Sequence, residues 1–117
     1  MDAQWLLERY QREHNRLVRG EAPNLGSLLS LFSPDAEMVF EGVDVGPFEG
    51  SAAIGRAFKD RPPTDELTLS PARPVDETTI VADYRWASAP TRRAGTITLV
   101  EKSGYIARLT VWARRST

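Results

Sequence analysis

The single histidine of the chain and a nearby tyrosine are the side chains best suited to acid–base chemistry. Apolar residues recur at steps of three and four over residues 3–19, a spacing typical of an amphipathic helix. Tyr10 and His14 belong to its apolar stripe and lie one helical turn apart. An imidazole gains or loses a proton near neutral pH, so this pair is a candidate proton-transfer site. The alternative is that both are hydrogen-bonded, partly buried core residues.

Composition argues against several other chemistries. The 117 residues contain no cysteine, which excludes disulfides, thiolate nucleophiles and cysteine-ligated metal centres. One histidine cannot supply the two or three imidazoles that are usual in a catalytic zinc site. The glycines between residues 42 and 55 lack the spacing of a phosphate-binding loop. We therefore expect neither a metal nor a cofactor.

The charge balance argues against nucleic acid as a partner. The chain has 15 basic and 16 acidic residues, a net charge of -1 and no basic stripe. Its N-terminus lacks the basic and apolar regions of a signal peptide. The longest apolar-rich run, residues 25–32, is far shorter than the ~20 residues that span a bilayer. We expect one domain over residues 1–117, located in the cytoplasm and without a membrane partner.

The first half of the chain is predicted to be mainly helical. Gly20 ends the first helix, and a second apolar helical pattern begins at Asn24, its expected N-cap, and ends at Pro34. A short strand over residues 36–41 follows, then a glycine-rich loop. A compact helix that begins at Ser51 completes this half.

The second half is predicted to form an antiparallel sheet. Alternating apolar and polar residues predict strands over residues 66–70, 78–88, 95–102 and 105–114. Ser103-Gly104 makes a tight turn between the last two strands. Both faces of those strands carry apolar side chains, so we expect helices on one face and a second subunit on the other. Helices followed by antiparallel strands indicate an α+β fold.

Residues 31–58 resemble the core of the NTF2-like superfamily, in particular its SnoaL-like and ketosteroid-isomerase-like branches. The resemblance lies in Phe32-Ser33-Pro34-Asp35-Ala36 before the strand and in Gly46-Pro47-Phe48-Glu49-Gly50 before the helix. It implies a cone-shaped α+β fold, in which N-terminal helices pack in a strongly curved antiparallel sheet with an apolar pocket at its open end. It also implies a homodimer formed through the convex face of the sheet.

The resemblance also suggests where ketosteroid-isomerase chemistry should be sought. Those enzymes use an Asp as the base, while a tyrosine and a protonated Asp stabilise the enolate. Alignment on the shared motifs places Phe40 at the position of the base, Thr96 at that of the protonated Asp, and Glu13 near that of the tyrosine. Glu41 follows Phe40 and would point to the opposite face unless the strand bulges. Standard steroid isomerisation is therefore not expected.

Two functions remain open at this point. One is an acid–base isomerase or cyclase that binds a small hydrophobic molecule, with His14, Tyr10 and Glu41 as candidate catalytic residues. The other is a non-catalytic module that binds a ligand or dimerises. The ligand-binding residues that the resemblance implies are Phe32, Met38, Phe40, Phe58, Tyr84, Trp86, Thr96, Thr98, Leu109 and Val111.

Overall fold

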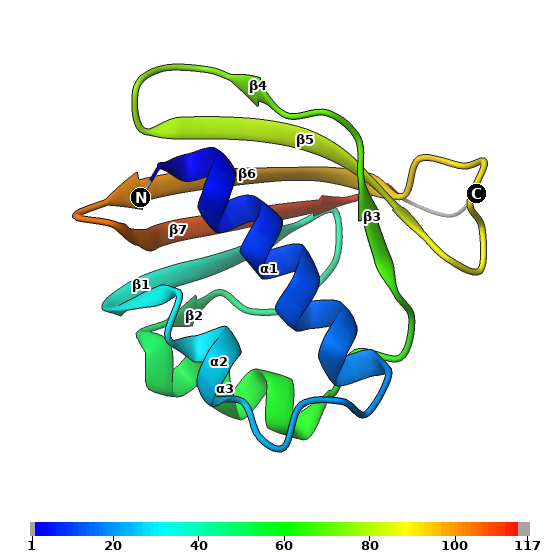
Figure 1. Ribbon diagram of the computed structural model, residues 1–117, viewed down its shortest axis with the longest axis horizontal. Coiled ribbons are helices and arrows are strands. Elements are labelled where there is room, and N and C mark those ends of the chain that lie inside the picture. Colours follow the sequence, from blue (N-terminus) through cyan, green and yellow to red (C-terminus); the bar gives the residue numbers. More distant parts are fainter. Residues whose placement is uncertain (1, 115–117) are drawn as a thin grey trace.

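The computed structural model describes residues 2–114 and places helices against one mixed sheet (Figure 1). The helices are α1 (Ala3–Val18), α2 (Gly26–Leu29) and α3 (Ser51–Asp60). The strands are β1 (Phe32–Glu41), β2 (Phe48–Glu49), β3 (Leu67–Leu69), β4 (Arg73–Pro74), β5 (Thr79–Trp86), β6 (Gly95–Lys102) and β7 (Tyr105–Ala113). None of the helices in the described range has the length and apolar character needed to cross a membrane.

The sheet is curved and unclosed, with the strand order β2-β1-β7-β6-β5-β3 and β4 paired with β5. The prediction of an α+β fold is confirmed, but the sheet is not wholly antiparallel, because β1 pairs with β7 in parallel. Figure 1 shows α1 lying across one face of the sheet, with α2 and α3 below β1 and β2. Strands β1, β5 and β7 run toward the same end of the molecule, where α3 also ends.

The core lies between α1 and the face of the sheet that it covers. Alternate residues of each strand point to this face, which is why the strands carry the two-residue pattern of the sequence. Each large aliphatic side chain buried there contributes roughly 1.5–3 kcal/mol. The largest fully buried apolar residues are Leu6, Leu7, Leu28, Ile54, Ile97, Leu99, Ile106 and Leu109.

The second helix is shorter than the sequence pattern predicts. Helix α2 is a single turn that ends at Leu29, and the chain enters β1 at Phe32. Pro34 therefore lies inside a strand and does not end a helix. It is exposed and falls where the pairing of β1 with β7 is interrupted, so its missing N–H group is tolerated. The Asn24 side chain accepts a hydrogen bond from the N–H of Gly26 at 2.8 Å.

A bulge in β7 changes which of its side chains are buried. Simple alternation puts Ile106 on the face opposite Leu109 and Val111. In the structure Ala107 has no partner on β6, so one extra residue is inserted at that point. The bulge brings Ile106 to the same buried face as Leu109 and Val111.

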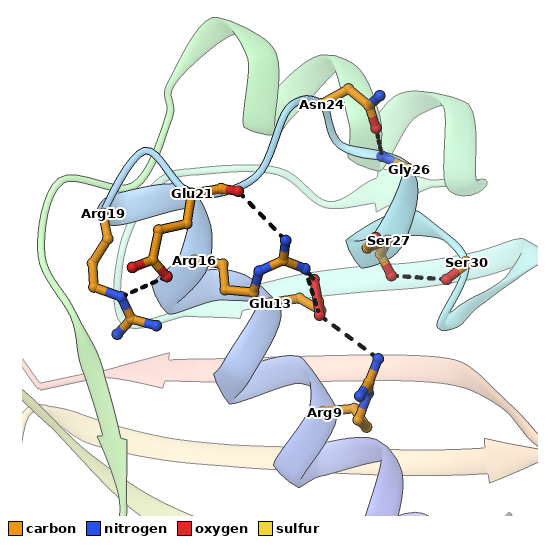
Figure 2. Close-up of polar contacts among 9 residues, drawn as sticks. All are labelled: Arg9, Glu13, Arg16, Arg19, Glu21, Asn24, Gly26, Ser27 and Ser30. Carbon is orange, nitrogen blue, oxygen red and sulfur yellow. Dashed lines mark hydrogen bonds and ion pairs between the residues drawn. The ribbon is translucent and has the colours of Figure 1, made fainter.

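One buried carboxylate anchors the C-terminal half of α1 (Figure 2). Glu13 is only 2% exposed, and its Oε1 accepts a hydrogen bond from Nη1 of Arg16 at 2.8 Å. Nη2 of Arg9 lies 3.7 Å from the other carboxylate oxygen. Arg16 also donates to the carbonyl of Glu21 at 3.4 Å, which ties the end of α1 to the chain that leads to α2. A buried charge needs such partners to offset its lost hydration.

Replacing this carboxylate should destabilise the fold. We expect Glu13→Gln to lower the free energy of unfolding by about 1–3 kcal/mol, because two guanidinium groups lose their counter-charge. Both arginines are about one-third exposed, which keeps the loss below that of a fully buried pair. Urea unfolding measures the change. Glu8→Gln, at an exposed position of the same helix, should change stability by less than about 0.5 kcal/mol. Equal losses in the two variants would contradict the anchoring role.

Candidate active site

A cavity of about 520 Å³ opens at the end of the sheet where β5 ends and β6 begins. Small-molecule sites typically have volumes of ~300–1,000 Å³ and mostly apolar walls. Most of this wall is apolar, and its uncharged polar members are Tyr10, His14 and Tyr84. The apolar lining consists of Met38, Phe40, Val43, Val45, Phe58, Pro63, Leu67, Trp86, Ala89, Ala94, Ile97, Val111 and Ala113.

His14 lies in this wall, near the C-terminal end of α1, and is 4% exposed. Its imidazole lies near the rings of Tyr10 and Trp86, with ring centroids 6.1 and 5.9 Å away. Burial lowers the pKa of His14 below its ordinary value of 6.5, because the charged form loses its hydration. A hydrogen bond with Asn15 and the charge of Asp65 oppose this shift in pKa but do not cancel it. His14 is therefore uncharged at neutral pH.

Asn15 determines which ring nitrogen of His14 carries the proton. The Asn15 amide donates to the carbonyl of Leu67 at 2.8 Å and accepts from the N–H of Leu67 at 2.7 Å. These two bonds fix the orientation of the amide, so its oxygen faces Nδ1 of His14 as an acceptor at 3.0 Å. The proton of the neutral imidazole consequently resides on Nδ1, and Nε2 keeps its lone pair.

Asp65 provides a negative charge near His14. Its carboxylate accepts hydrogen bonds from the hydroxyl and the N–H of Ser88, at 2.5 and 3.1 Å. These bonds with Ser88 lower the pKa of Asp65, and the nearby His14 lowers it further. The ionised carboxylate favours the protonated form of His14. Asp65 can thus stabilise an imidazolium that forms during a reaction.

Tyr10 and Tyr84 supply hydroxyl groups near the cavity and are both almost completely buried. Burial raises the pKa of each phenol above its ordinary value, and for Tyr10 the neighbouring Tyr84 adds to the effect. Both phenols therefore stay protonated at neutral pH and can donate hydrogen bonds. The Tyr84 hydroxyl donates to the carbonyl of Trp112 at 3.4 Å. Within residues 2–114 the Tyr10 hydroxyl has no such partner and is not a fully enclosed polar atom. Because Tyr10 lines the cavity, this hydroxyl is a candidate donor to a ligand.

The structure brings together most of the residues predicted for the site. Those that line the cavity are Tyr10, His14, Met38, Phe40, Phe58, Tyr84, Trp86 and Val111. Phe32 and Leu109 are buried in the core and do not line the cavity. Phe32 packs edge-on against the ring of Tyr10, with ring centroids 6.3 Å apart, and so supports this wall from behind.

Three predicted residues lie on the outer face of the sheet. Thr96 and Thr98 alternate with Ile97, which lines the cavity, so these two threonines lie on the opposite face of the sheet and do not line the cavity. The Thr96 hydroxyl instead donates to the carboxylate of Asp83 at 3.2 Å. Glu41 is exposed because β1 pairs with β7 without interruption from residue 37 to residue 41, and no bulge turns it inward. Glu41 is therefore placed away from the cavity.

Sequence reasoning did not identify Asn15 as a functional residue. Its role depends on Leu67, which is 52 positions away in the chain, so no local pattern signals the contact. Among residues 2–114, no three His, Asp or Glu side chains gather as a metal site would require.

No protein-family model matches the sequence, and no curated protein matches it. Solved structures do match its fold. An NTF2-like protein of unknown function from Cytophaga hutchinsonii is 11% identical with a TM-score of 0.70, covering 93% of this chain and 87% of that one. The chain has an NTF2-like fold. The resemblance drawn from residues 31–58 is thereby confirmed at the level of the fold.

Two further structural matches carry provisional functional names. A protein from Kribbella flavida, provisionally a ketosteroid isomerase, is 16% identical with a TM-score of 0.71, covering 96% of this chain and 77% of that one. A protein from Sinorhizobium meliloti, provisionally a polyketide cyclase, is 22% identical with a TM-score of 0.62. The match covers 91% of this chain and 92% of that one. At these identities the likeness shows the fold alone, so function must be argued from the site.

The buried His14 should make stability depend on pH. Its pKa is lower in the folded chain than in the unfolded one, so the unfolded chain binds the proton more readily. This contribution to the free energy of unfolding should be complete above about pH 6.5 and decrease as the pH falls toward the folded-state pKa. Urea unfolding of the wild type and of His14→Gln over the same pH series measures the difference.

The chain has one histidine, so an NMR titration of the imidazole reports the pKa of His14 directly. A titration midpoint above 6.5 in the folded protein would contradict this prediction.

Proposed function

We propose that this NTF2-like protein is a small acid–base enzyme of the isomerase or cyclase kind, acting on a mostly hydrophobic molecule that contains a carbonyl group. The observation that carries the proposal is the neutral His14, which Asn15 holds with its lone pair on Nε2 in the wall of an apolar cavity. The provisional names of the Kribbella flavida and Sinorhizobium meliloti structures support the same class of chemistry.

The proposed reaction begins with proton transfer to Nε2 of His14. The base removes a proton from the carbon next to the carbonyl, the C–H electron pair forms a carbon–carbon double bond, and the carbonyl oxygen takes the negative charge. The protonated Tyr10 hydroxyl is the donor available to that oxygen. If the substrate also carries a carbon–carbon double bond next to the deprotonated carbon, the negative charge extends over a dienolate. The imidazolium, stabilised by the charge of Asp65, then returns its proton to the far carbon of that dienolate and completes an isomerisation.

Loss of the base should abolish most of the activity. We expect His14→Gln to reduce turnover by ~10²- to 10⁴-fold, and Tyr10→Phe to reduce it by a smaller factor. Because proton abstraction is the common first step, the assay follows deuterium exchange beside the carbonyl of steroid and aryl ketones in heavy water, by NMR. Arg12→Gln, exposed on the same helix, is the matched control and should retain full activity. Wild-type exchange rates in His14→Gln would rule out this base.

Asn15 is a positioning residue in this scheme. We expect Asn15→Leu to lower the exchange rate and to change the nitrogen chemical shifts of the imidazole, because the proton is no longer held on Nδ1. A packing role alone would alter stability and leave the imidazole nitrogen shifts as in the wild type.

A second candidate function is ligand binding without catalysis, which the mainly apolar wall of the cavity favours. This function requires that the wild type bind a hydrophobic molecule. It also requires that the wild type catalyse deuterium exchange of the ketones no faster than the His14→Gln variant does. The homodimer and the cytoplasmic location stay predictions. Trp112, 37% exposed on the outer face of β7, supports the homodimer, because a large apolar side chain on a sheet face is suited to an interface.

A further inference from the structure

Four arginines line the mouth of the cavity, and we infer from them that its ligand is an amphipathic anion with its carboxylate or phosphate group at the exposed end. The inference rests on the proposed function in one respect, which is that the cavity is the ligand site. The arginines are Arg61, Arg92, Arg93 and Arg114. Among the described residues that line this cavity there is no Asp or Glu. The chain as a whole has 16 acidic and 15 basic residues, so composition does not explain the excess of arginine.

Separate segments of the chain bring these arginines together. Arg61 follows α3, Arg92 and Arg93 belong to the loop between β5 and β6, and Arg114 follows β7. Figure 1 shows the end of α3, this loop and the end of β7 at one end of the molecule. The clustering therefore arises in three dimensions and is not the consequence of one basic run in the sequence.

The polarity of the cavity changes from its interior to its mouth. All four arginines are exposed, whereas wall residues such as Met38, Leu67 and Ile97 are buried. A ligand that matches this arrangement places an apolar body inside and a charged group at the opening. Its apolar body then lies beside His14, which also lines the cavity.

Much of the positive charge at the mouth has no ion-pair partner among residues 2–114. Within residues 2–114, Arg93 is the one of the four that forms an ion pair, at 3.7 Å from Asp83, and its guanidinium also lies over the ring of Trp112. Arg61 also borders an adjoining hollow that Asp44 and Asp60 line, so the potential is weaker on that side. Arg92 and Arg114 are therefore the arginines best placed to bind an anion.

Guanidinium groups suit oxyanions because they donate two parallel hydrogen bonds to a pair of oxygens. Carboxylate and phosphate groups share this geometry.

Four probes with a common naphthyl ring as the apolar body distinguish a carboxylate from a phosphate, and an anion from a neutral or cationic ligand. They are naphthoate, naphthyl phosphate, naphthylmethanol and naphthylmethylammonium. The first two carry the anions, the third is neutral, and the fourth has the wrong sign of charge.

The test measures the dissociation constants of these probes by calorimetry with the whole chain. We expect at least one anion to bind about tenfold more tightly than naphthylmethanol, since several partly exposed ion pairs each contribute up to about fivefold. The cation should bind most weakly. The preference for the anion should shrink at high ionic strength, because the arginines are exposed.

The double variant Arg92→Gln and Arg114→Gln should reduce the preference for the anion from about tenfold to less than threefold. It should leave the binding of naphthylmethanol unchanged within about twofold, because its apolar contacts remain. Arg56→Gln, exposed on α3 and outside the cavity lining, is the matched control and should keep the full preference.

The outcomes separate this inference from the proposed function. If naphthoate, naphthyl phosphate and naphthylmethanol bind equally to the wild type, the inference is overturned and the ligand site stands. If the preference for the anion persists in the double variant, the arginines do not cause it and the inference is overturned too. If no probe binds and the imidazole signals of His14 do not shift, the cavity is not a site for such ligands and both proposals are overturned.

Discussion

The packing of α1 against the curved sheet is the contact on which the rest of the structure depends. The apolar stripe of the helix fills the space between the strands at one end, where Leu6 and Leu7 are almost fully buried. Toward its C-terminal end the same stripe continues as Tyr10 and His14, which border the cavity. The cavity is thus the part of the curved sheet that the helix does not fill, and Tyr10 and His14 of that helix line it.

Placing polar groups on a buried helical stripe has consequences for both stability and chemistry. Burial lowers the pKa of His14 and keeps the imidazole neutral, which costs stability at low pH and provides a base at neutral pH. Asn15 compensates by pairing with both backbone groups of Leu67 while orienting the imidazole. Glu13 is buried on the same helix, and Arg9 and Arg16 balance its charge. Glu13, His14 and Asn15 thus each have hydrogen-bond or ion-pair partners that hold this part of the helix in place.

The NTF2-like fold does not dictate the chemistry of this cavity. Phe40 occupies the place where the resemblance puts the catalytic Asp of ketosteroid isomerases, and it makes the wall apolar. The base proposed here comes from α1 instead, opposite that strand. The arginines at the mouth come from segments that the resemblance does not describe at all. Loops around a stable scaffold can differ in sequence between proteins of one fold, because the packing of the core does not depend on them.

The sequence by itself determined the five longer strands, the long first helix and the α+β class, because each depends on local periodicity and on the order of the elements. The two-residue strands β2 and β4 were not predicted. It also placed Tyr10 and His14 on one buried stripe, since helical spacing alone sets that relation. Tertiary structure decided which face of β6 is buried and so moved Thr96 and Thr98 out of the site. It also created the bulge at Ala107 and gathered the arginines at the mouth. These features depend on how distant segments pair and pack, and strand alternation does not reveal which of two apolar-bearing faces the helix will cover.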